Sequence, residues 1–293
     1  MRTRNSFQLN SFYLSLKDMA DVDIECLHSL SIGVRWPHRA NDWDMLRSIG
    51  TGTVAIDDIG RAVGSAMWFD YGASFATIGM VITAPRLQVR GTATWLMDRV
   101  LQDIGNRNIG LNATRAAKRL YRVLGFQPEC PVYQHQGRVF PPPTTETAAV
   151  ERQPGDLSDI LLLDREAFAA DRSRALVRLA AVSKIIALVR GGKLVAYSFC
   201  REFGRGVVVG PVIAANDGDA IAVVRPHLLD HAGRFVRLDT REESGDFPQF
   251  LTLSGMPVFD AVTTMSYGRP WIGSSSPNQG KPKVYGLAAQ ALG

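Results

Sequence analysis

The period of the hydrophobic pattern changes twice between Phe75 and Phe126, and this stretch organises the rest of the chain. The apolar run 76–84 is short, rich in β-branched residues and followed by Pro85, which predicts a buried strand. After a loop, apolar residues recur at helical spacing through 96–104, which predicts an amphipathic helix. A short strand and turn over 108–114 and a helix over 115–124, ended by Gly125, complete the stretch.

The flanking pattern predicts the remaining elements of a first domain. We expect a strand over 7–16 and a helix through 22–30, for which Asp18, Asp21 and Asp23 are N-cap candidates. An aromatic and cationic loop over 33–39 precedes a second helix. The other expected elements are that helix at 41–49, a hairpin of strands 53–57 and 61–71, and a closing strand at 131–136.

A proline run at 141–143 marks the best domain boundary, because such a segment forms a stiff, extended linker. The second half repeats the order of elements. We expect helices at 156–168 and 171–182, a hairpin at 185–201, a strand at 206–214, a helix at 219–232, and then strand, helix and strand to 267. The predicted organisation is a first domain at 1–138, a linker at 139–150, a second domain at 151–268 and a tail at 269–293 that docks onto the domains.

Composition and charge narrow the class of protein. The chain has 293 residues, of which 46% are hydrophobic and 21% charged, which is typical of a globular protein with room for two domains. The net charge of +5 suits a polyanionic ligand, but the scattered cations argue against nucleic-acid binding. The three cysteines are far apart and form no CxxC pair, which favours a reducing cytoplasm. No signal peptide or membrane-spanning run is predicted.

The loop between the predicted strand and helix has the parts of a diphosphate cradle. Gly91 and Ala93 are small residues where the loop turns into the helix, so the backbone can approach a ligand closely. The first N–H groups of a helix point outward and bind anions, and Arg90 adds a cation.

Two motifs in this stretch resemble one family. The loop fits a Gln/Arg-x-x-Gly-x-Gly/Ala pattern at Gln88, Gly91 and Ala93, and the later helix fits Ala-x-x-Leu-Tyr-x-x-x-Gly-Phe over 117–126. Together, in this order, they are similar to the GCN5-related N-acetyltransferases, the GNAT family. The resemblance is firm over roughly residues 7–136. It implies an α/β fold of tandem GNAT domains, each with a mixed, mostly antiparallel sheet flanked by helices.

The second half departs from the family motif. Where the first half has Gln88–Ala93, the second has 215–220, with Asp217 and Asp219 at the entrance of its helix, and these would repel a diphosphate. The tyrosine of the later helix is also missing. The chain therefore resembles a bacterial tandem type with a degenerate second domain that shapes the acceptor site.

The resemblance implies direct acetyl transfer from acetyl-CoA, used as a co-substrate, to a small-molecule amine. It assigns Tyr121 as proton donor to the leaving thiolate, and Asn112 to the pantetheine arm. Trp36, His38 and Asp70 are the expected acceptor contacts. The expected cofactor-binding residues are Met80, Val81 and Ile82, whose backbone in a bulged strand would meet the thioester, together with Gln88, Val89, Arg90, Gly91, Thr92 and Ala93.

Several points stay open in the sequence. The general base is one of Glu25, His28, His38, Asp42 and Asp70, or a water chain. Asn112 also suits a plain turn. The i,i+4 pair His227 and His231 lacks a third ligand, so no metal is predicted. Cys130 has only His135 nearby, which argues against a cysteine nucleophile.

Other functions compatible with the sequence are a protein or peptide acetyltransferase and a non-catalytic acyl-CoA-binding regulatory protein. An aminoacyl transferase that uses aminoacyl-tRNA ranks last, because the coenzyme A loop is intact. No nucleic-acid or membrane partner is expected, the location is expected to be cytoplasmic, and the oligomeric state is a monomer or a homodimer.

Overall fold

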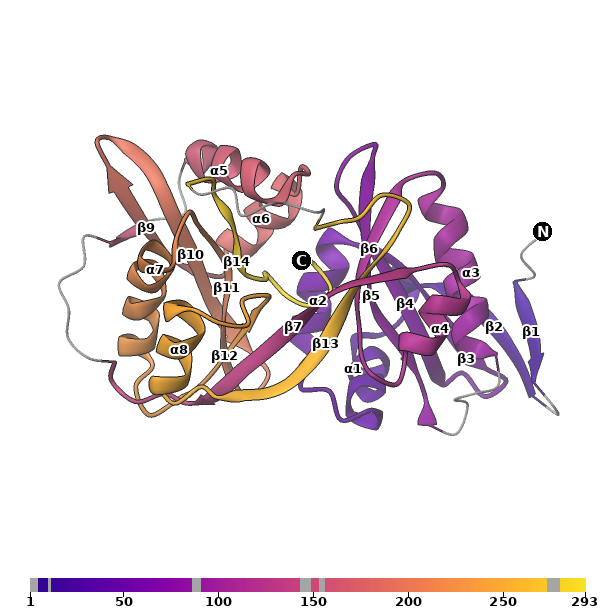
Figure 1. Cartoon of the computed structure of the whole chain (residues 1–293). Helices are drawn as coiled ribbons and strands as arrows, with labels where there is room; N and C mark the ends of the chain where they lie inside the picture. Colours follow the sequence, from indigo (N-terminus) through magenta and orange to yellow (C-terminus); the bar gives the residue numbers. More distant parts are fainter. Residues whose placement is uncertain (1–4, 10–11, 86–90, 143–148, 153–155, 273–279) are drawn as a thin grey trace. The chain divides into compact units, whose positions relative to one another are not determined.

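The structure is a computed structural model that describes residues 5–9, 12–85, 91–142, 149–152, 156–272 and 280–293 (Figure 1). The chain divides into two compact units, Met1–Gly110 and Leu111–Gly293. Each unit is built from a sheet flanked by helices, and the sequence prediction of a mixed α/β fold is confirmed. Within the described residues no helix has both the length and the apolar character needed to cross a membrane.

The first unit contains an antiparallel meander in the order β1-β2-β3-β4-β5. Helices cover this sheet, so β3, β4 and β5 are almost entirely buried. These strands therefore show little alternation of buried and exposed residues. The strands are β1 (Ser6–Leu9), β2 (Phe12–Asp18), β3 (Thr51–Asp57), β4 (Ala62–Asp70) and β5 (Phe75–Thr83). The helices are η1 (Met19–Asp21), α1 (Ile24–Gly33), α2 (Ala40–Ile49) and α3 (Thr92–Ile104).

Helix α3 has the amphipathic face that the sequence predicts. Leu96, Met97, Val100 and Ile104 are all buried, and Trp95 extends the same face. The helix packs against β3, β4 and β5. Burial of this face fixes the position of the α3 N-terminus beside the end of β5.

The second unit contains the strand order β6-β13-β7-β12-β11-β10-β9-β8, and β14 pairs with β11. Strands β11 and β12 run parallel, whereas the pairs β7–β12, β7–β13 and β10–β11 are antiparallel. The strands are β6 (Asn108–Ala113), which crosses the unit boundary, β7 (Gln127–Arg138), β8 (Val150–Arg152), β9 (Lys184–Arg190), β10 (Lys193–Phe203), β11 (Gly206–Ala214), β12 (Phe235–Thr240), β13 (Val258–Tyr267) and β14 (Lys283–Gly286). The helices are α4 (Lys118–Val123), α5 (Ser158–Phe168), α6 (Ser173–Ala180), α7 (Asp217–Asp230) and α8 (Asp246–Leu253).

Strand β7 differs from the sequence prediction in length and in partner. The strand predicted at 131–136 is confirmed, but β7 already starts at Gln127, and it lies between β12 and β13 of the second half instead of closing the first domain. The longer strand includes Pro128 and Pro131, which lie where β7 pairs with β13 alone. Proline is tolerated at such an edge position.

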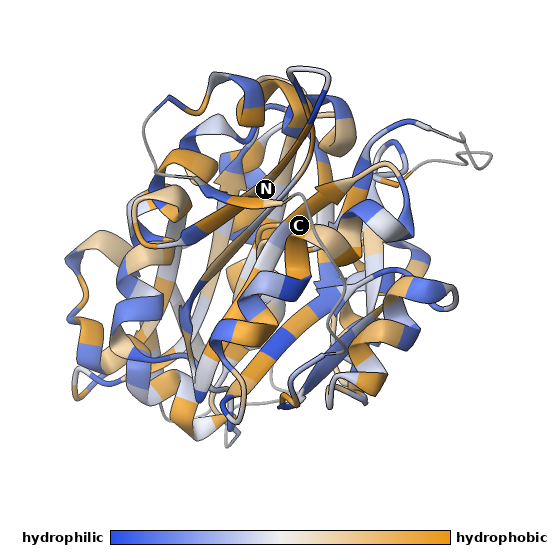
Figure 2. Cartoon of the chain, turned by 90° about the vertical axis from the view of Figure 1, so that its left-hand side faces the viewer, coloured by the Kyte–Doolittle hydropathy of each residue, from blue (hydrophilic) through white to orange (hydrophobic). Residues whose placement is uncertain are grey.

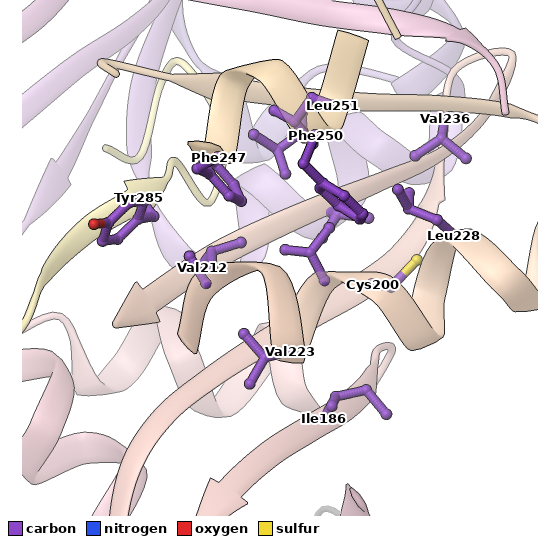
Figure 3. Close-up of a cluster of buried hydrophobic side chains, with 14 of the residues drawn as sticks. Ile186, Cys200, Val212, Val223, Leu228, Val236, Phe247, Phe250, Leu251 and Tyr285 are labelled. Atoms are coloured by element: carbon purple, nitrogen blue, oxygen red, sulfur yellow. The ribbon is translucent and has the colours of Figure 1, made fainter. Parts of the chain in front are cut away.

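The main core of the second unit lies under α7 and α8 (Figure 3). Phe247 and Tyr285 meet edge to face at its rim, with ring centroids 5.2 Å apart. Helices of the protein carry both hydrophobic and hydrophilic stretches, as Figure 2 shows, which is the pattern expected of helices that cover a sheet. Tyr285 belongs to β14, so the C-terminal segment is part of this core.

Candidate functional site

Strand β5 carries a bulge at the residues where the resemblance implies one. Ser65 pairs with Ile82 and Met67 with Gly79, so Met80 and Val81 together oppose one residue of β4. Met80 has a φ of 51°, which is a rare conformation for a residue with a side chain. Its carbonyl accepts a hydrogen bond from the buried Ser65 hydroxyl at 2.8 Å. The predicted bulge is therefore confirmed, and it frees backbone groups of β5 from the ladder.

The N-terminus of α3 is not capped by its own side chains. Gly91 is the N-cap residue, has a φ of 89° and makes no side-chain cap. Thr92 is completely buried, and its hydroxyl has no hydrogen-bond partner among the described residues. Free N–H groups, the positive end of a helix dipole and an unpaired buried hydroxyl together suit an anion. Ala93 is half-buried at the same end, while Gln88, Val89 and Arg90 lie outside the described residues.

Gly64 lets this helix end approach the bulged strand. A Cβ atom on Gly64 would lie 2.9 Å from the Leu96 side chain and 3.1 Å from the Ile82 carbonyl oxygen. The methyl group of Thr92 is 3.6 Å from the same point. A residue with a side chain would push α3 away from β4, so the bulge and the uncapped helix end depend on this glycine.

The expected acceptor residues of the first unit make contacts of their own. Trp36 and His38 lie together, with ring centroids 5.7 Å apart. Asp70 is exposed at the end of β4, and one of its oxygens lies 3.7 Å from the Arg107 guanidinium. These contacts neither require nor preclude an acceptor role.

Three further candidate general bases also make contacts within the protein. The Asp42 carboxylate caps α2 by accepting from the Arg39 backbone at 2.8 Å, and Glu25 lies 3.8 Å from His28. The identity of the base therefore stays a prediction from sequence.

Tyr121 is buried on α4 among aromatic rings of the second unit. Its ring meets Phe126 at 5.9 Å, and Phe126 in turn meets Tyr267 at 5.6 Å. Burial raises the pKa of the Tyr121 phenol well above its usual value of 10. The phenol therefore stays protonated at neutral pH, as a proton donor must. Helix α4 starts at Lys118 rather than at Arg115, because residues 115–117 form a turn.

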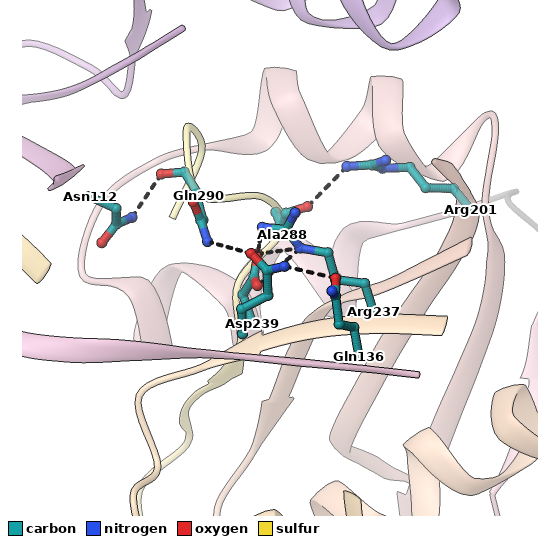
Figure 4. Close-up of polar contacts among 8 residues, drawn as sticks. Asn112, Gln136, Arg201, Arg237, Asp239, Ala288 and Gln290 are labelled. Carbon is teal, nitrogen blue, oxygen red and sulfur yellow. Dashed lines mark hydrogen bonds and ion pairs between the residues drawn. The ribbon is translucent and has the colours of Figure 1, made fainter. Parts of the chain in front are cut away.

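Asn112 joins a polar network that sequence spacing could not reveal. Its amide donates to the Gln290 carbonyl oxygen at 2.7 Å (Figure 4). Its carbonyl accepts from the Thr264 hydroxyl at 2.8 Å. Its partners lie 178 and 152 residues away along the chain. Asn112 is thus held by β13 and by the C-terminal segment, and a contact with pantetheine stays a prediction.

In the second half, side chains of the protein itself occupy the N-terminus of α7. Asn216 caps α7 by accepting from the Asp219 N–H at 2.9 Å, and Asp219 pairs with Arg190 at 2.6 Å. Asp217 accepts from the Phe247 N–H at 2.9 Å and from the Tyr285 hydroxyl at 2.8 Å. The chain's own carboxylates occupy the position where an anion would bind.

The backbone beside this helix entrance is also occupied. Strands β11 and β12 pair only at Val207–Val236 and Val208–Arg237. Beyond these pairs β14 adds to β11, from Val212 to Ala214, and the Leu287 N–H donates to the Asp239 carbonyl oxygen at 2.8 Å. Arg201 holds the Ala288 carbonyl oxygen at 3.1 Å (Figure 4). The C-terminal segment therefore satisfies the backbone groups that the separation of β11 and β12 leaves unpaired.

In the part of the chain that the structure describes, no three His, Cys, Asp or Glu side chains lie close enough together to bind a metal ion. His227 instead meets the Ser198 hydroxyl at 2.9 Å, and His231 Nδ1 meets the His227 carbonyl oxygen at 2.8 Å. Both histidines thus have structural partners.

Comparison with known proteins agrees with this architecture. Two models of the acetyltransferase (GNAT) domain match the chain, one over residues 49–128 and the other over 160–286. The first match contains the bulged strand, the α3 N-terminus and Tyr121. No curated protein matches the sequence.

Solved structures show the same fold. A proposed acetyltransferase from Pyrococcus horikoshii is similar with a TM-score of 0.80 and 18% identity, covering 100% of this chain and 99% of that one. A GCN5-related N-acetyltransferase from Sphaerobacter thermophilus has a TM-score of 0.61, 16% identity and coverage of 89% and 97%. A tandem GNAT protein from the clavulanic acid biosynthesis pathway has a TM-score of 0.62, 15% identity and coverage of 88% and 99%.

The order of strands and helices around a mixed sheet occurs twice in the chain, whereas the bulged β5 and the uncapped end of α3 belong to the first copy. The chain belongs to the GNAT family and carries two GNAT domains in tandem. The domain boundaries given by the sequence, at 138 and 150, stay predictions.

Proposed function

We propose that the protein is an N-acetyltransferase that transfers the acetyl group of acetyl-CoA directly to a small-molecule amine. One observation carries the proposal. Within the first unit, a strand bulged at Met80 is followed by a helix whose N-terminus holds a left-handed Gly91 and a buried, unpaired Thr92 hydroxyl. This arrangement offers free backbone groups for an amide-containing arm and a positive helix end for a diphosphate.

The proposed chemistry uses these groups in sequence. The amine nitrogen attacks the thioester carbonyl carbon, and backbone N–H donors at the β5 bulge stabilise the negative charge that develops on the oxygen. The carbon–sulfur bond then breaks, and Tyr121 donates its proton to the thiolate. The proton lost by the amine passes to a base or to water. Asn112, Trp36, His38 and Asp70 keep their proposed roles as contacts to the cofactor or the acceptor.

We further propose that only the first half binds acetyl-CoA. The chain's own Asp217 and Asp219 neutralise the entrance of α7, and β14 occupies the unpaired edge of β11. A second molecule of acetyl-CoA would have to displace both.

The test is a calorimetric titration of the protein with acetyl-CoA. One site per chain is expected. In Gly91→Glu the affinity should fall about 100-fold, because a carboxylate beside a diphosphate costs several kcal/mol. The matched control is Gly105→Glu at the other end of α3, since Gly105 also has a positive φ of 70° and has open space around it. No binding by the wild type, or equal binding by both variants, would refute the proposal, and two sites would refute the assignment to the first half.

Turnover is then measured as thiol release over a broad panel of amines. Release with at least one amine, abolished together with binding in Gly91→Glu, supports an enzyme. Binding without turnover over the whole panel supports the alternative of a regulatory acyl-CoA-binding protein.

A further inference from the structure

Arg241 carries a buried guanidinium nitrogen that has no hydrogen-bond partner in the described part of the chain. It follows β12 in the second unit, and its Nε donates to the Thr264 hydroxyl at 3.3 Å. The guanidinium lies over the Trp271 ring, 4.8 Å from the ring centroid. Its Nη2 atom is buried and has no hydrogen-bond partner among the described residues. A buried guanidinium N–H without a partner is costly, and proteins keep such groups where a ligand completes them.

The acidic groups near Arg241 are committed elsewhere. Both oxygens of Glu129 accept backbone N–H groups, from Trp271 and Ile272, at 2.8 Å each. The Cys130 thiol, which burial keeps protonated by raising its pKa, also lies beside the guanidinium. Burial lowers the pKa of Arg241 to about 10, so it is still a cation at neutral pH.

The second arginine nearby, Arg172, is already neutralised. It forms a two-pronged pair with Asp164, with both distances 2.8 Å, and donates to the Gly293 carbonyl oxygen at 2.6 Å. Arg172 therefore has no free group to offer a ligand, whereas Nη2 of Arg241 has no hydrogen-bond partner among the described residues.

The network links Arg241 to Asn112, one residue of the proposed chemistry. The Thr264 hydroxyl links the Arg241 guanidinium to Asn112. The adjacent residue of β13, Thr263, accepts from Lys118 of α4, the helix that carries Tyr121. Neighbouring side chains of a strand point to opposite faces, so Arg241 and Asn112 lie on the face of β13 opposite to α4. Asn112, Thr264 and Arg241 thus lie together within the second unit, on one face of β13.

We propose that Arg241 binds a carboxylate of the amine acceptor, so that the substrates are amines that also carry a carboxylate, such as amino acids. This inference rests on the proposed function. A guanidinium stacked on a ring keeps its N–H edge for in-plane, bidentate binding, and a carboxylate fits that edge. A single arginine suits one carboxylate, whereas a phosphate dianion would need a second cation.

The experiment compares the free acid and the primary amide of each of the twenty amino acids as acceptors. In the wild type the acid should be used with a kcat/KM at least 10-fold above that of its amide. Arg241→Gln should reduce this preference to near unity and leave the Kd of acetyl-CoA unchanged. Arg241→Lys should keep part of the preference, since the charge remains and the bidentate geometry is lost. The matched control is Arg234→Gln, which removes an exposed arginine paired with Glu202.

A second readout needs no turnover. Cys130 lies beside Arg241, so a bound acid should slow its alkylation by iodoacetamide, followed by mass spectrometry, more than the matching amide does. Cys26, in the first unit, is the internal reference. Thr264→Val, which keeps the shape of the side chain but removes the linking hydroxyl, should weaken both effects if Arg241→Gln does not fold.

The outcomes separate this inference from the proposed function. An acid preference in turnover or in Cys130 protection that Arg241→Gln abolishes supports the carboxylate site. Equal behaviour of acids and amides in both assays overturns it, even when acetyl-CoA binds. Failure of acetyl-CoA to bind overturns the proposed function, whatever the Cys130 assay shows.

Discussion

At the scale of single residues, burial decides which groups can exchange protons. The Tyr121 phenol is surrounded by aromatic rings, which raises its pKa and keeps it protonated, whereas Cys130 and Cys200 stay thiols for the same reason. Cys200 belongs to the core of the second unit. A protonated phenol suits the role proposed for Tyr121 as an acid, whereas neither thiol is poised to act as a thiolate.

Removal of the Tyr121 hydroxyl should separate catalysis from binding. We expect Tyr121→Phe to lower kcat about 100-fold and to leave the Kd of acetyl-CoA unchanged, because a general acid acts only on the leaving thiolate. Because the phenol pKa is raised, the wild-type kcat should show no loss from Tyr121 ionisation up to pH 10. The control is Tyr267→Phe, which removes a hydroxyl from the exposed end of the same aromatic cluster. Equal kcat values for the two variants would exclude Tyr121 as the acid.

His227 should make the protein less stable in mild acid. Burial lowers its pKa from 6.5 to about 3. Because the Ser198 hydroxyl donates to the Val223 carbonyl oxygen, Nε2 of His227 must donate to Ser198, which leaves Nδ1 buried without a partner among the described residues. Below pH 6.5 the His227 side chain is therefore protonated in the unfolded chain but stays neutral in the folded chain. The free energy of unfolding should fall by about 2 kcal/mol between pH 6.5 and 5 through this residue.

The measurement is urea unfolding of the wild type, His227→Gln and His231→Gln at pH 7 and pH 5. His227→Gln should lose less stability between the two pH values than the other proteins, although it starts lower. Burial also lowers the pKa of His135, but that contribution is common to all three proteins and cancels in the comparison. Parallel losses in the three proteins would rule out His227 as the source.

At the scale of elements, both halves have a strand followed by a helix, β5 and α3 in the first half and β11 and α7 in the second. The halves differ in how the edge of that strand and the N-terminus of that helix are satisfied. In the first half, β5 is bulged and α3 is left uncapped. In the second half, β11 is completed by β14 and α7 is capped by Asn216. The sequence predicted the loss of the phosphate loop from Asp217 and Asp219. It could not predict that β14 pairs with β11 at this position. The four residues of β14 are too few to show a strand pattern, and a strand pattern does not identify the partner strand.

The packing of the C-terminal segment, residues 280–293, should be disrupted by a single methyl group added at Gly210. A Cβ atom on Gly210 would overlap the Leu287 carbonyl oxygen, which is backbone and cannot rotate away. We expect Gly210→Ala to lower the free energy of unfolding by about 2 kcal/mol and to make residues 280–293 more sensitive to protease. Gly33→Ala, at a helix end with open space, should change stability by less than about 0.5 kcal/mol. Wild-type protease resistance of the segment in Gly210→Ala would contradict this seating.

At the scale of the whole chain, local sequence patterns predicted most of the helices and strands. They did not predict which elements far apart in the sequence pair with one another. The α3 face and the end of α4 at Gly125 follow from spacing within about ten residues, and the β5 bulge was implied by the family resemblance. By contrast, the partners of β7 and the Asn112–Thr264–Arg241 network join segments more than 100 residues apart. Hydrophobic alternation shows that a segment is a strand, and register and partner are settled only when the sheet assembles. Arg241 was missed for this reason, since nothing in its local sequence distinguishes it from a surface arginine.

The position of β7 predicts that the two halves cannot be separated by cutting the linker. Residues 127–138 come from the first half of the chain, yet they lie between β12 and β13, with backbone pairing along both edges from Tyr133 to His135. Pulling β7 out would expose two strand edges and unpair its hydrogen bonds. A protease site inserted within 143–148 should therefore be cleaved to give two pieces that coelute on gel filtration and part only in denaturant. A matched site inserted within 273–279, beyond β13, tests cleavage without cutting between β7 and its partners. Two separately eluting, folded pieces after cleavage at 143–148 would show that β7 does not hold the halves together.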